Sequence, residues 1–371
     1  MDVKKGKVFV ALIHGLHVGG AQKMMLSILN YFAKKNFEVH LIVFSAGGIL
    51  QKELAQEVIV HELNSNSISK GMGKCLKLIY KLKPNFVFSG IGHLNLALAP
   101  FIPVLKLMLP KTHWIARETN IVSLQNKEAK YPKIFDWLYQ YFYKNYDKII
   151  AQSLDMKKDL EENYGLIARV QVINNPVNIE KVEALANSNE KILFNSQRIN
   201  LLSVAGLRKE KCHDLMLKVI VLLDDKYHLH IVGSGELETK LLALAKSLGI
   251  EKRVSFLGYQ SNPYAYMKQA DLFLLTSQRE GFPNVLLEAN SLGLPIVAFS
   301  SLGGITEIID EGVNGFTVPF ERIEEMAQEI EKAHNFVFNK KRIQEMTKER
   351  YAYGSILKKY EQLFSSLEDE K

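Results

Sequence analysis

The sequence has little cysteine: Cys75 and Cys212 are its only two, and they lie far apart in the 371-residue chain. Two isolated cysteines exclude a disulfide framework and a cysteine-based zinc site. Their scarcity is typical of a reducing compartment, so we expect a cytoplasmic protein.

The sequence also lacks an apolar run that could cross a bilayer as one helix. Its longest apolar stretch, residues 94–110, contains three prolines and Lys106, whereas a spanning helix needs about 20 consecutive apolar residues. The apolar run at residues 8–13 is too short for a secretion signal and is followed by His14. We therefore expect a soluble or peripheral protein.

Neither proline, glycine nor charge is abundant. The chain has 10 Pro, 23 Gly, 23% charged and 47% hydrophobic residues, a composition that excludes disordered, collagen-like and coiled-coil proteins. At roughly 150 residues per domain, the length favours two domains over one.

Positive charge is concentrated in the first half of the chain. Residues 1–178 carry 23 Lys and Arg against 13 Asp and Glu, whereas residues 179–371 carry 24 against 27. Apart from a merely solvated surface, this asymmetry indicates an anionic partner: nucleic acid, a phosphorylated substrate or a lipid surface. No RNA-binding signature accompanies the basic half, so we expect no nucleic acid.

Strand-like and helix-like segments alternate along the sequence. Strands are expected at residues 7–13, 37–44, 86–89, 113–116, 148–152, 199–204, 228–232, 254–257, 272–276 and 295–299. Helices are expected at residues 21–35, 70–82, 132–146, 213–223, 236–248 and 284–292. This alternation predicts an α/β protein with two doubly wound parallel sheets, in which ligands bind at the carboxyl ends of strands.

We expect three parts along the chain. Residues 1–178 form a first Rossmann-like domain, residues 179–345 form a second, and residues 346–371 form a C-terminal helix that crosses back to the first domain. The change of charge after residue 178 and the turn residues at 174–177 place the first boundary.

The most informative segment for chemistry is EGFPNVLLEA at residues 280–289, which leaves a strand and opens a helix. Pro283 suits the first helical position, and the N-terminus of a helix attracts phosphate or sugar oxygens. Glu288 lies one turn into the helix among apolar residues, where a carboxylate needs hydrogen-bond donors such as the two hydroxyls of a ribose.

The pair Glu280 and Glu288, with seven residues between them, resembles the nucleotide-sugar signature of retaining GT-B glycosyltransferases of family 4. Six further segments resemble that family in the same order along the chain: VGGAQ 18–22, IAQS 150–153, VINNPV 172–177, VGSGEL 232–237, VSFLG 254–258 and GGITE 303–307. The resemblance implies two Rossmann-like domains, with the acceptor on the first and the nucleotide sugar on the second. It also implies that no cofactor or metal is needed.

The resemblance assigns roles to residues of the second domain. Glu288 should bind the ribose, Glu280 should face the transferred sugar, and Lys211 should neutralise the leaving diphosphate. Further donor-binding positions are Gly233, Gly281, Phe282, Asn284 and Val285. Gly206 stands where the family usually has an arginine, and Arg208 is the candidate replacement. An NAD-dependent dehydrogenase is disfavoured, because Glu238 replaces the third glycine of a dinucleotide fingerprint.

Candidate residues of the first domain follow its strands. Gly19 and Gly20 allow close approach of a ligand to the backbone. Many relatives have a histidine in the loop after strand 113–116, but that loop reads RETN here. We assign Glu118 as the crevice group of this loop, and His113 is expected to be a packed strand residue.

Two features of the first half suit a membrane. Lys70, Lys74, Lys77 and Lys81 share one helix face, which is either solvated or contacts anionic lipid or a lipid-linked diphosphate. Seven aromatic residues, which could lie at a membrane interface but are expected to be core, cluster nearby: Tyr131, Phe135, Trp137, Tyr139, Tyr141, Phe142 and Tyr143.

We therefore expect a retaining glycosyltransferase, transferring a hexosyl or N-acetylhexosaminyl group. It would move a sugar from a nucleotide sugar, UDP-linked, to a glycan or polyprenyl-diphosphate-linked acceptor in cell-surface glycan assembly, at the inner face of the cell membrane. Two alternatives stay open: a UDP-sugar epimerase on the same scaffold, and a nucleotide-binding module without turnover.

Overall fold

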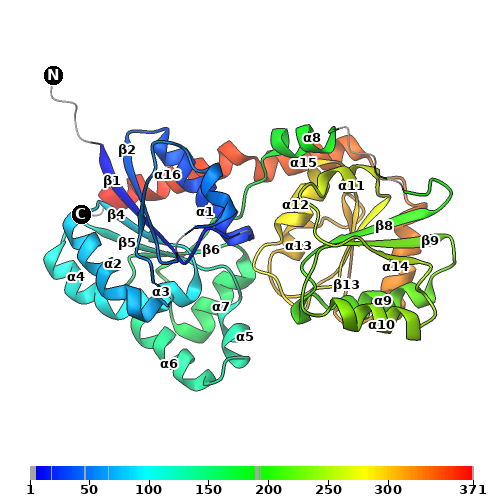
Figure 1. Cartoon of the computed structure of the whole chain (residues 1–371), viewed down its shortest axis with the longest axis horizontal. Helices are drawn as coiled ribbons and strands as arrows, with labels where there is room; N and C mark the ends of the chain where they lie inside the picture. Colours follow the sequence, from blue (N-terminus) through cyan, green and yellow to red (C-terminus); the bar gives the residue numbers. More distant parts are fainter. Residues whose placement is uncertain are drawn as a thin grey trace. The chain divides into compact units, whose positions relative to one another are not determined.

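The computed structural model describes residues 6–17, 19–45, 47–65, 67–188, 192 and 194–369. The chain forms two compact units (Figure 1). Met1–Asn175 and Ile356–Lys371 make the first unit, and Pro176–Ser355 make the second. The C-terminal segment therefore packs with the N-terminal residues of the chain.

The first unit has a seven-stranded parallel sheet in the order β3-β2-β1-β4-β5-β6-β7. Its strands are β1 Lys7–Ile13, β2 Phe37–Val43, β3 Ile59–Glu62, β4 Phe86–Ser89, β5 His113–Arg117, β6 Lys148–Ala151 and β7 Val170–Val172. Its α-helices are α1 Gly20–Ala33, α2 Ile68–Leu82, α3 Gly92–Leu98, α4 Ile102–Met108, α5 Val122–Lys127, α6 Pro132–Phe142, α7 Leu154–Tyr164 and α16 Tyr353–Asp369. Short 3₁₀ turns occur at η1 Ile49–Glu53, η2 Ala99–Phe101 and η3 Tyr143–Asn145.

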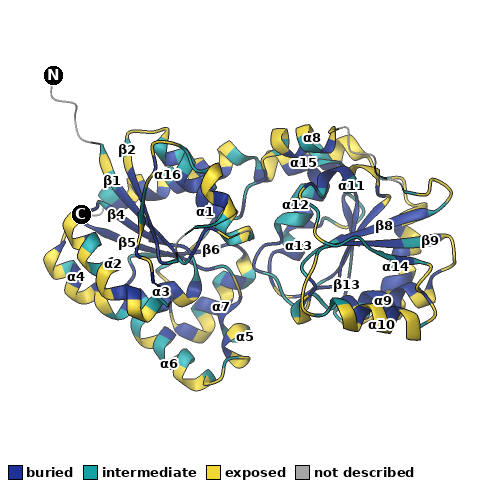
Figure 2. Cartoon of the chain, viewed as in Figure 1, coloured by how far each residue is buried: buried dark blue, intermediate teal, exposed yellow. Residues whose placement is uncertain are grey.

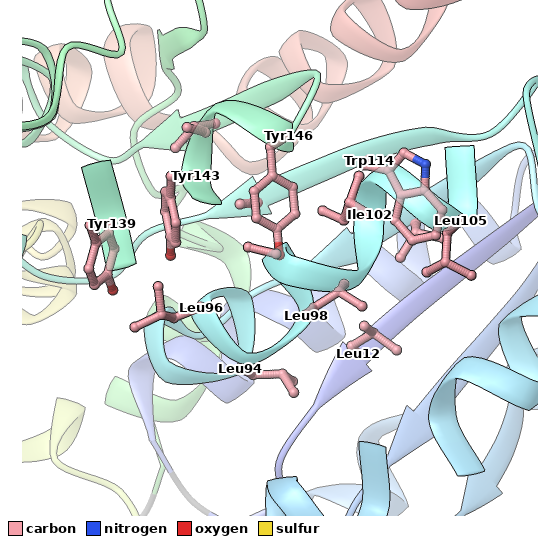
Figure 3. Close-up of a cluster of buried hydrophobic side chains, with 14 of the residues drawn as sticks. Leu12, Leu94, Leu96, Leu98, Ile102, Leu105, Trp114, Tyr139, Tyr143 and Tyr146 are labelled. Carbon is pink, nitrogen blue, oxygen red and sulfur yellow. The ribbon is translucent and has the colours of Figure 1, made fainter. Parts of the chain in front are cut away.

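Both faces of this sheet are buried, as expected for parallel strands. On one face, apolar residues of α2, α3, α4, α6 and α7 pack on β1, β4 and β5. Figure 3 shows part of this cluster, with residues of α3, α4 and α6 near Leu12 of β1 and Trp114 of β5. On the other face, the Phe364 ring of α16 lies 4.9 Å from the rings of Phe32 and Phe86 and 5.4 Å from that of Phe9. The last helix is therefore a part of the first unit's core.

The second unit has a six-stranded parallel sheet in the order β10-β9-β8-β11-β12-β13. Its strands are β8 Ile199–Val204, β9 Tyr227–Val232, β10 Val254–Phe256, β11 Leu272–Leu275, β12 Ile296–Phe299 and β13 Gly315–Val318. Its helices are α8 Ile179–Ala186, η4 Lys209–Lys211, α9 His213–Leu222, α10 Glu238–Ser247, α11 Tyr264–Gln269, α12 Asn284–Ser291, α13 Ile305–Ile308, α14 Ile323–Asn335 and α15 Lys340–Tyr351. The strand order reverses between β8 and β11, which is where ligands bind in open α/β sheets.

The expected fold class, two Rossmann-like doubly wound domains, is confirmed. The expected strands are present, and three more that sequence reasoning missed, β3, β7 and β13, lie at sheet edges. The apolar stretch 94–110 contributes to α3, η2 and α4. Among the described residues, no helix is both long and apolar enough to cross a bilayer.

Candidate donor site

Lys211 and Glu280 form an ion pair at the carboxyl edge of the second sheet. Lys211 follows β8 and Glu280 follows β11, so the two residues flank the point where the strand order reverses. The Lys211 Nζ lies 2.6 Å from the Glu280 Oε1, and the two side chains are 16% and 12% exposed. The structure thus brings together two residues, 69 positions apart, that the sequence assigned to one site.

Hydrogen bonds from the β11 loop hold the Lys211 turn in place. The Thr276 Oγ1 donates to the carbonyl oxygens of Lys211 and Cys212, at 3.0 and 3.1 Å. The backbone N–H of Gln278 donates to the carbonyl of Glu210, at 2.9 Å. Because these bonds hold the backbone of residues 210–212 against the loop after β11, the turn that carries Lys211 is joined to the loop that leads to Glu280.

The segment 303–304 supports the Glu280 loop from the other side. Gly303 has φ +120°, and a Cβ built there would lie 2.1 Å from the Glu280 carbonyl oxygen. The N–H of Gly304 donates to the Gly281 carbonyl at 3.1 Å, and the N–H of Glu280 donates to the Leu302 carbonyl at 3.0 Å. Glycine is required at 303 because any side chain would push the Glu280 backbone away.

Helix α12 begins directly after this loop. Pro283 precedes the helix as its N-cap residue with φ −75° and ψ 97°, so the expectation that it occupies the first helical position is wrong by one residue. The extended ψ of Pro283 turns the chain into the helix at Asn284. The positive end of the helix dipole therefore lies at residues 283–285, beside Glu280, and suits a phosphate or sugar oxygen.

Glu288 is partly exposed and lies one turn into α12. The Tyr264 hydroxyl of α11 donates to its Oε1 at 3.1 Å. A carboxylate can accept several hydrogen bonds, so the chemistry of Glu288 suits the hydroxyls of a diol. Phe282, in contrast, is 4% exposed, and its ring packs against that of Tyr351. Only the backbone of Phe282 is therefore suited to contact a ligand.

The loop after β9 packs against the loop that precedes Lys211. Gly233 has φ +146°, and a Cβ built there would lie 2.0 Å from the Ala205 carbonyl oxygen. The N–H of Leu207 donates to the Ser234 carbonyl at 3.0 Å. Gly233 therefore has a packing role, because it lets the two loops approach each other at the carboxyl edge of the sheet.

Arg208 occupies the side of this turn that faces solvent. Its side chain is 60% exposed, and its Nε lies 3.2 Å from the Glu210 Oε1. A Cβ built on Gly206 would lie 3.5 Å from the same Nε. The guanidinium group of Arg208 thus lies beside Gly206, which is the position where the resemblance places an arginine.

The structure also shows a residue that sequence reasoning missed. His213 opens α9 directly after this turn and is 2% exposed. Burial, together with the nearby charge of Lys211, lowers the pKa of His213 to about 4, so the ring is neutral at pH 7. Its position two residues after Lys211 was the signal available in the sequence.

Glu118 follows the expected strand but is buried, whereas from the sequence it was expected in the crevice. It lies just after β5 but is only 1% exposed, and it accepts hydrogen bonds from the Tyr143 hydroxyl and from the Asn95 Nδ2 at 3.0 Å. Burial raises the pKa of Glu118 to about 7, although these donors and Arg117 oppose the rise. A carboxyl enclosed in this way does not suit the crevice role assigned to it.

The neighbouring polar residues form a buried network. The Arg117 Nη2 donates to the Asn175 Oδ1 at 2.5 Å, and its Nε donates to the Tyr360 hydroxyl at 3.2 Å. The Asn175 Nδ2 donates to the Gln152 Oε1 at 2.9 Å. The segments IAQS 150–153 and VINNPV 172–177 therefore share a structural role, which is to tie strand ends to α16.

Gly19 and Gly20 lie where expected, at the start of α1, with Gly19 as its N-cap residue. Val18, the first residue of that segment, lies outside the described residues. The rings of His14 and His93, which follow β1 and β4, lie 6.2 Å apart. His113 is a packed strand residue, as expected, because it is 4% exposed and stacks on Phe86.

In the part of the chain that the structure describes, no three His, Cys, Asp or Glu side chains come close enough to hold a metal ion. Positive charge at the candidate site comes from Lys211, from Arg208 in the same turn and from the N-terminus of α12. An arrangement of this kind can bind an anionic group, and it places a carboxylate, Glu280, beside whatever that group carries.

Comparisons with known proteins agree with this arrangement. The model of glycosyltransferase family 4 matches residues 18–181, and that of glycosyl transferases group 1 matches residues 186–350. An uncharacterized glycosyltransferase of Methanocaldococcus jannaschii is 30% identical over 67% of this chain, a match that spans 63% of that protein.

Two further proteins cover 85% or more of the chain. One is the N-acetylgalactosamine-N,N'-diacetylbacillosaminyl-diphospho-undecaprenol 4-alpha-N-acetylgalactosaminyltransferase of Campylobacter jejuni, 27% identical over 85% of this chain and 87% of that enzyme. The other is the structure of Anabaena HepE in complex with UDP, with a TM-score of 0.77 and 18% identity over 97% of this chain and 100% of that one. The latter likeness shows the GT-B fold alone. The family models, spanning both units in order, show that this chain belongs to the family 4 glycosyltransferases and is itself a glycosyltransferase.

Proposed function

We propose that the protein transfers a hexosyl or N-acetylhexosaminyl group from a UDP-sugar to a glycan or polyprenyl-diphosphate-linked acceptor, with retention of configuration. The observation that carries this proposal is the Lys211–Glu280 pair beside the N-terminus of α12. UDP is the ligand of the similar HepE structure. The Campylobacter relative is named as a transferase that acts on a sugar linked to diphospho-undecaprenol.

In this proposal, binding of the donor replaces the Glu280 carboxylate by the diphosphate as the partner of Lys211. Without a donor, the ammonium group is neutralised by Glu280 at 2.6 Å. The diphosphate carries more negative charge than one carboxylate, so it replaces Glu280 as the partner of Lys211. Glu280 is then released toward the hydroxyls of the sugar, while Glu288 accepts from the ribose.

The same groups stabilise the leaving diphosphate. The bond between the anomeric carbon and the diphosphate oxygen breaks, and a bond to the acceptor oxygen forms on the same face of the sugar. The acceptor proton passes to the diphosphate. Lys211, Arg208 and the α12 dipole hold the charge that develops on the diphosphate, a role that metal ions have in other enzymes.

The acceptor side of the proposal involves the first unit. Gly19 and Gly20 at the start of α1 are the proposed acceptor contacts, and the excess of positive charge in residues 1–178 suits a diphosphate-linked acceptor. We place the enzyme in the cytoplasm, peripherally at the inner face of the membrane, where it would take part in cell-surface glycan assembly.

One experiment tests the proposed function. The protein is incubated with labelled UDP-sugars, with and without a membrane lipid extract. Transfer of label to lipid or glycan, with the product anomer matching the donor by NMR, supports the proposal. Isomerised UDP-sugar without transfer would indicate an epimerase, and unchanged UDP-sugar that still binds would indicate a nucleotide-binding module; either result contradicts the proposal.

A further inference from the structure

Helices α4 and α6 of the first unit expose a group of large apolar side chains. We call this group the α4–α6 surface; each member is at least half exposed, and its residues are Val104, Leu107, Met108, Ile134, Trp137 and Tyr141. Single exposed apolar residues are ordinary, but several large ones on two helices of one layer indicate an interaction site. Figure 2 shows exposed residues along the outer sides of both helices.

The hydrophobic core does not need these side chains, because the inner faces of the same helices already fill it. Ile102 and Leu105 of α4 are buried, as are Tyr139 of α6 and Tyr143 of η3 (Figure 3). Helix α4 is thus apolar on both its inner and its outer face. A helix that is apolar all round is ordinarily covered on every side.

The two helices belong to one continuous layer. The Asn145 Nδ2, at the end of η3, donates to the Ala99 carbonyl of η2 at 3.1 Å. The Lys106 Nζ of α4 lies 2.5 Å from the Asp147 Oδ1, just after η3. Both helices pack on the same core face of the sheet.

On α6, the exposed aromatic rings are ordered against each other. The rings of Trp137 and Tyr141 are stacked, with centroids 5.4 Å apart and planes at 10°. The Lys144 Nζ lies 4.7 Å from the centroid of Tyr141. Trp and Tyr beside lysine form the combination that prefers the boundary between lipid headgroups and acyl chains.

The charges around the α4–α6 surface are mainly positive. Lys130, Lys133 and Lys144 are exposed on or beside α6. Asp136 accepts a hydrogen bond from the Tyr164 hydroxyl, at 2.8 Å, and Asp147 is paired with Lys106. Glu128 and, on the neighbouring helix α7, Glu162 are exposed acidic residues of this region, fewer than the exposed lysines. The surface is therefore complementary in charge to an anionic bilayer.

We propose that the α4–α6 surface inserts into the headgroup region of an anionic lipid bilayer. This inference rests on the proposed function in one respect, since a polyprenyl-linked acceptor lies in a membrane. The apolar side chains supply the insertion, and the surrounding lysines supply the attraction to anionic headgroups. Vesicle binding itself requires neither donor nor turnover, so it is measured independently of transfer.

The protein carries its own probe for this proposal. Its two tryptophans are Trp114, which is buried, and Trp137, which is 54% exposed. Vesicles containing phosphatidylglycerol should shift the Trp137 emission to the blue, and brominated lipids should quench it. Pure phosphatidylcholine vesicles should have a weaker effect, and salt should weaken the phosphatidylglycerol effect. A Trp137→Phe variant supplies the background from Trp114.

A flotation assay with matched variants completes the test. The triple variant Leu107→Ser, Trp137→Ser, Tyr141→Ser should lose at least about tenfold in vesicle partitioning, while a Leu242→Ser, Tyr259→Ser control in the second unit should partition like the parent. Leu242 and Tyr259 are likewise exposed, at 48% and 63%. Circular dichroism and UDP binding should be unchanged in both.

Three outcomes would overturn the inference. In the first, the triple variant floats like the parent. In the second, the protein floats but the Trp137 emission is neither shifted nor quenched, which assigns lipid contact to another surface. In the third, Trp137 is already shielded in a concentration-dependent dimer, which assigns the surface to a second copy. Vesicle binding without sugar transfer would instead uphold the inference while contradicting the proposed function.

Discussion

At the scale of single residues, Glu288 is the most direct test of nucleotide recognition. Replacing Glu288 with alanine removes the acceptor proposed for two ribose hydroxyls, so UDP affinity should fall by about 1–3 kcal/mol. Tyr264→Phe should have a smaller effect, because Tyr264 donates to Glu288 at 3.1 Å without contacting the nucleotide in this account. Calorimetry with UDP measures both effects.

The matched control for Glu288→Ala is Glu324→Ala, since Glu324 is an exposed carboxylate on α14 of the same unit. The control should bind UDP like the parent. Unchanged affinity in the Glu288 variant, with its fold intact by circular dichroism, would remove the ribose role from this residue.

Glu118 gives a pH dependence of stability whose sign follows from its burial. Its pKa is raised to about 7 in the folded protein, so the folded state favours the protonated carboxyl. The resulting stabilisation is complete below the unfolded pKa of about 4.3 and is lost as the pH rises through about 7. The full effect is on the order of 3 kcal/mol.

Urea unfolding of the parent and of Glu118→Gln between pH 4.5 and pH 8 isolates this contribution. Glutamine cannot ionise, so the difference in unfolding free energy between the two proteins should change across this range, with the parent losing stability relative to the variant as the pH rises. Parallel pH profiles would show that Glu118 is not a buried acid with a raised pKa.

At the scale of elements, the loop 302–304 is expected to control the shape of the donor site. Gly303→Ala places a methyl group 2.1 Å from the Glu280 carbonyl oxygen at a φ of +120°. We expect a loss of about 1–3 kcal/mol in the free energy of unfolding and a weaker affinity for UDP. Denaturant unfolding and calorimetry measure the two.

The control for this change is Gly354→Ala on α16, where an added Cβ meets nothing within 4 Å. Alanine is a better helix former than glycine, so this variant should be at least as stable as the parent. Equal stability and equal UDP affinity in the Gly303 variant would contradict the supporting role of the loop.

The lysine face of α2 is a second element with a testable role. Lys70, Lys74, Lys77 and Lys81 are all exposed on this helix. If they add electrostatic attraction to the bilayer, each lysine contributes on the order of 1 kcal/mol at low salt. Replacing all four with glutamine should weaken binding to anionic vesicles, measured by flotation, and leave UDP binding unchanged.

Two other results would be informative for α2. Persistent vesicle binding with a weaker apparent acceptor affinity would assign the lysines to the diphosphate of a lipid-linked acceptor. If neither quantity changes, the lysine face is only solvated, and the attraction to lipid has to come from Lys133 of α6 and from Lys130 and Lys144 beside it.

At the scale of the whole molecule, the alternation of apolar runs was enough to predict both sheets. Strands buried on both faces are continuous apolar runs, so β4 and β8 were predicted with their observed bounds, Phe86–Ser89 and Ile199–Val204. The edge strands β3, β7 and β13 were missed. β3 and β7 are largely exposed or half-buried, so they lack the continuous apolar run of a central strand.

The site was predicted unevenly, for physical reasons. Lys211 and Glu280 were paired because their segments resemble those of family 4 glycosyltransferases, and the structure shows that each follows a strand that adjoins the reversal of strand order. The burial of Glu118 depends on Tyr143 and Asn95, which reach it from other elements. The aromatic cluster was expected to be core, and the structure buries Tyr139 and Tyr143 but exposes Trp137. Helix α6 is apolar on several faces, so sequence spacing alone did not decide which face is covered.

In the proposed mechanism Lys211 serves the departure of the diphosphate, and this role can be measured by steady-state transfer from a UDP-sugar. Lys211→Ala should lower kcat by about a hundredfold or more, since its charge is needed most in the transition state. Lys209→Ala, a lysine in the same turn that is exposed, is the matched control and should keep the parent's turnover. A Lys211→Ala enzyme with the parent's kcat would contradict the account.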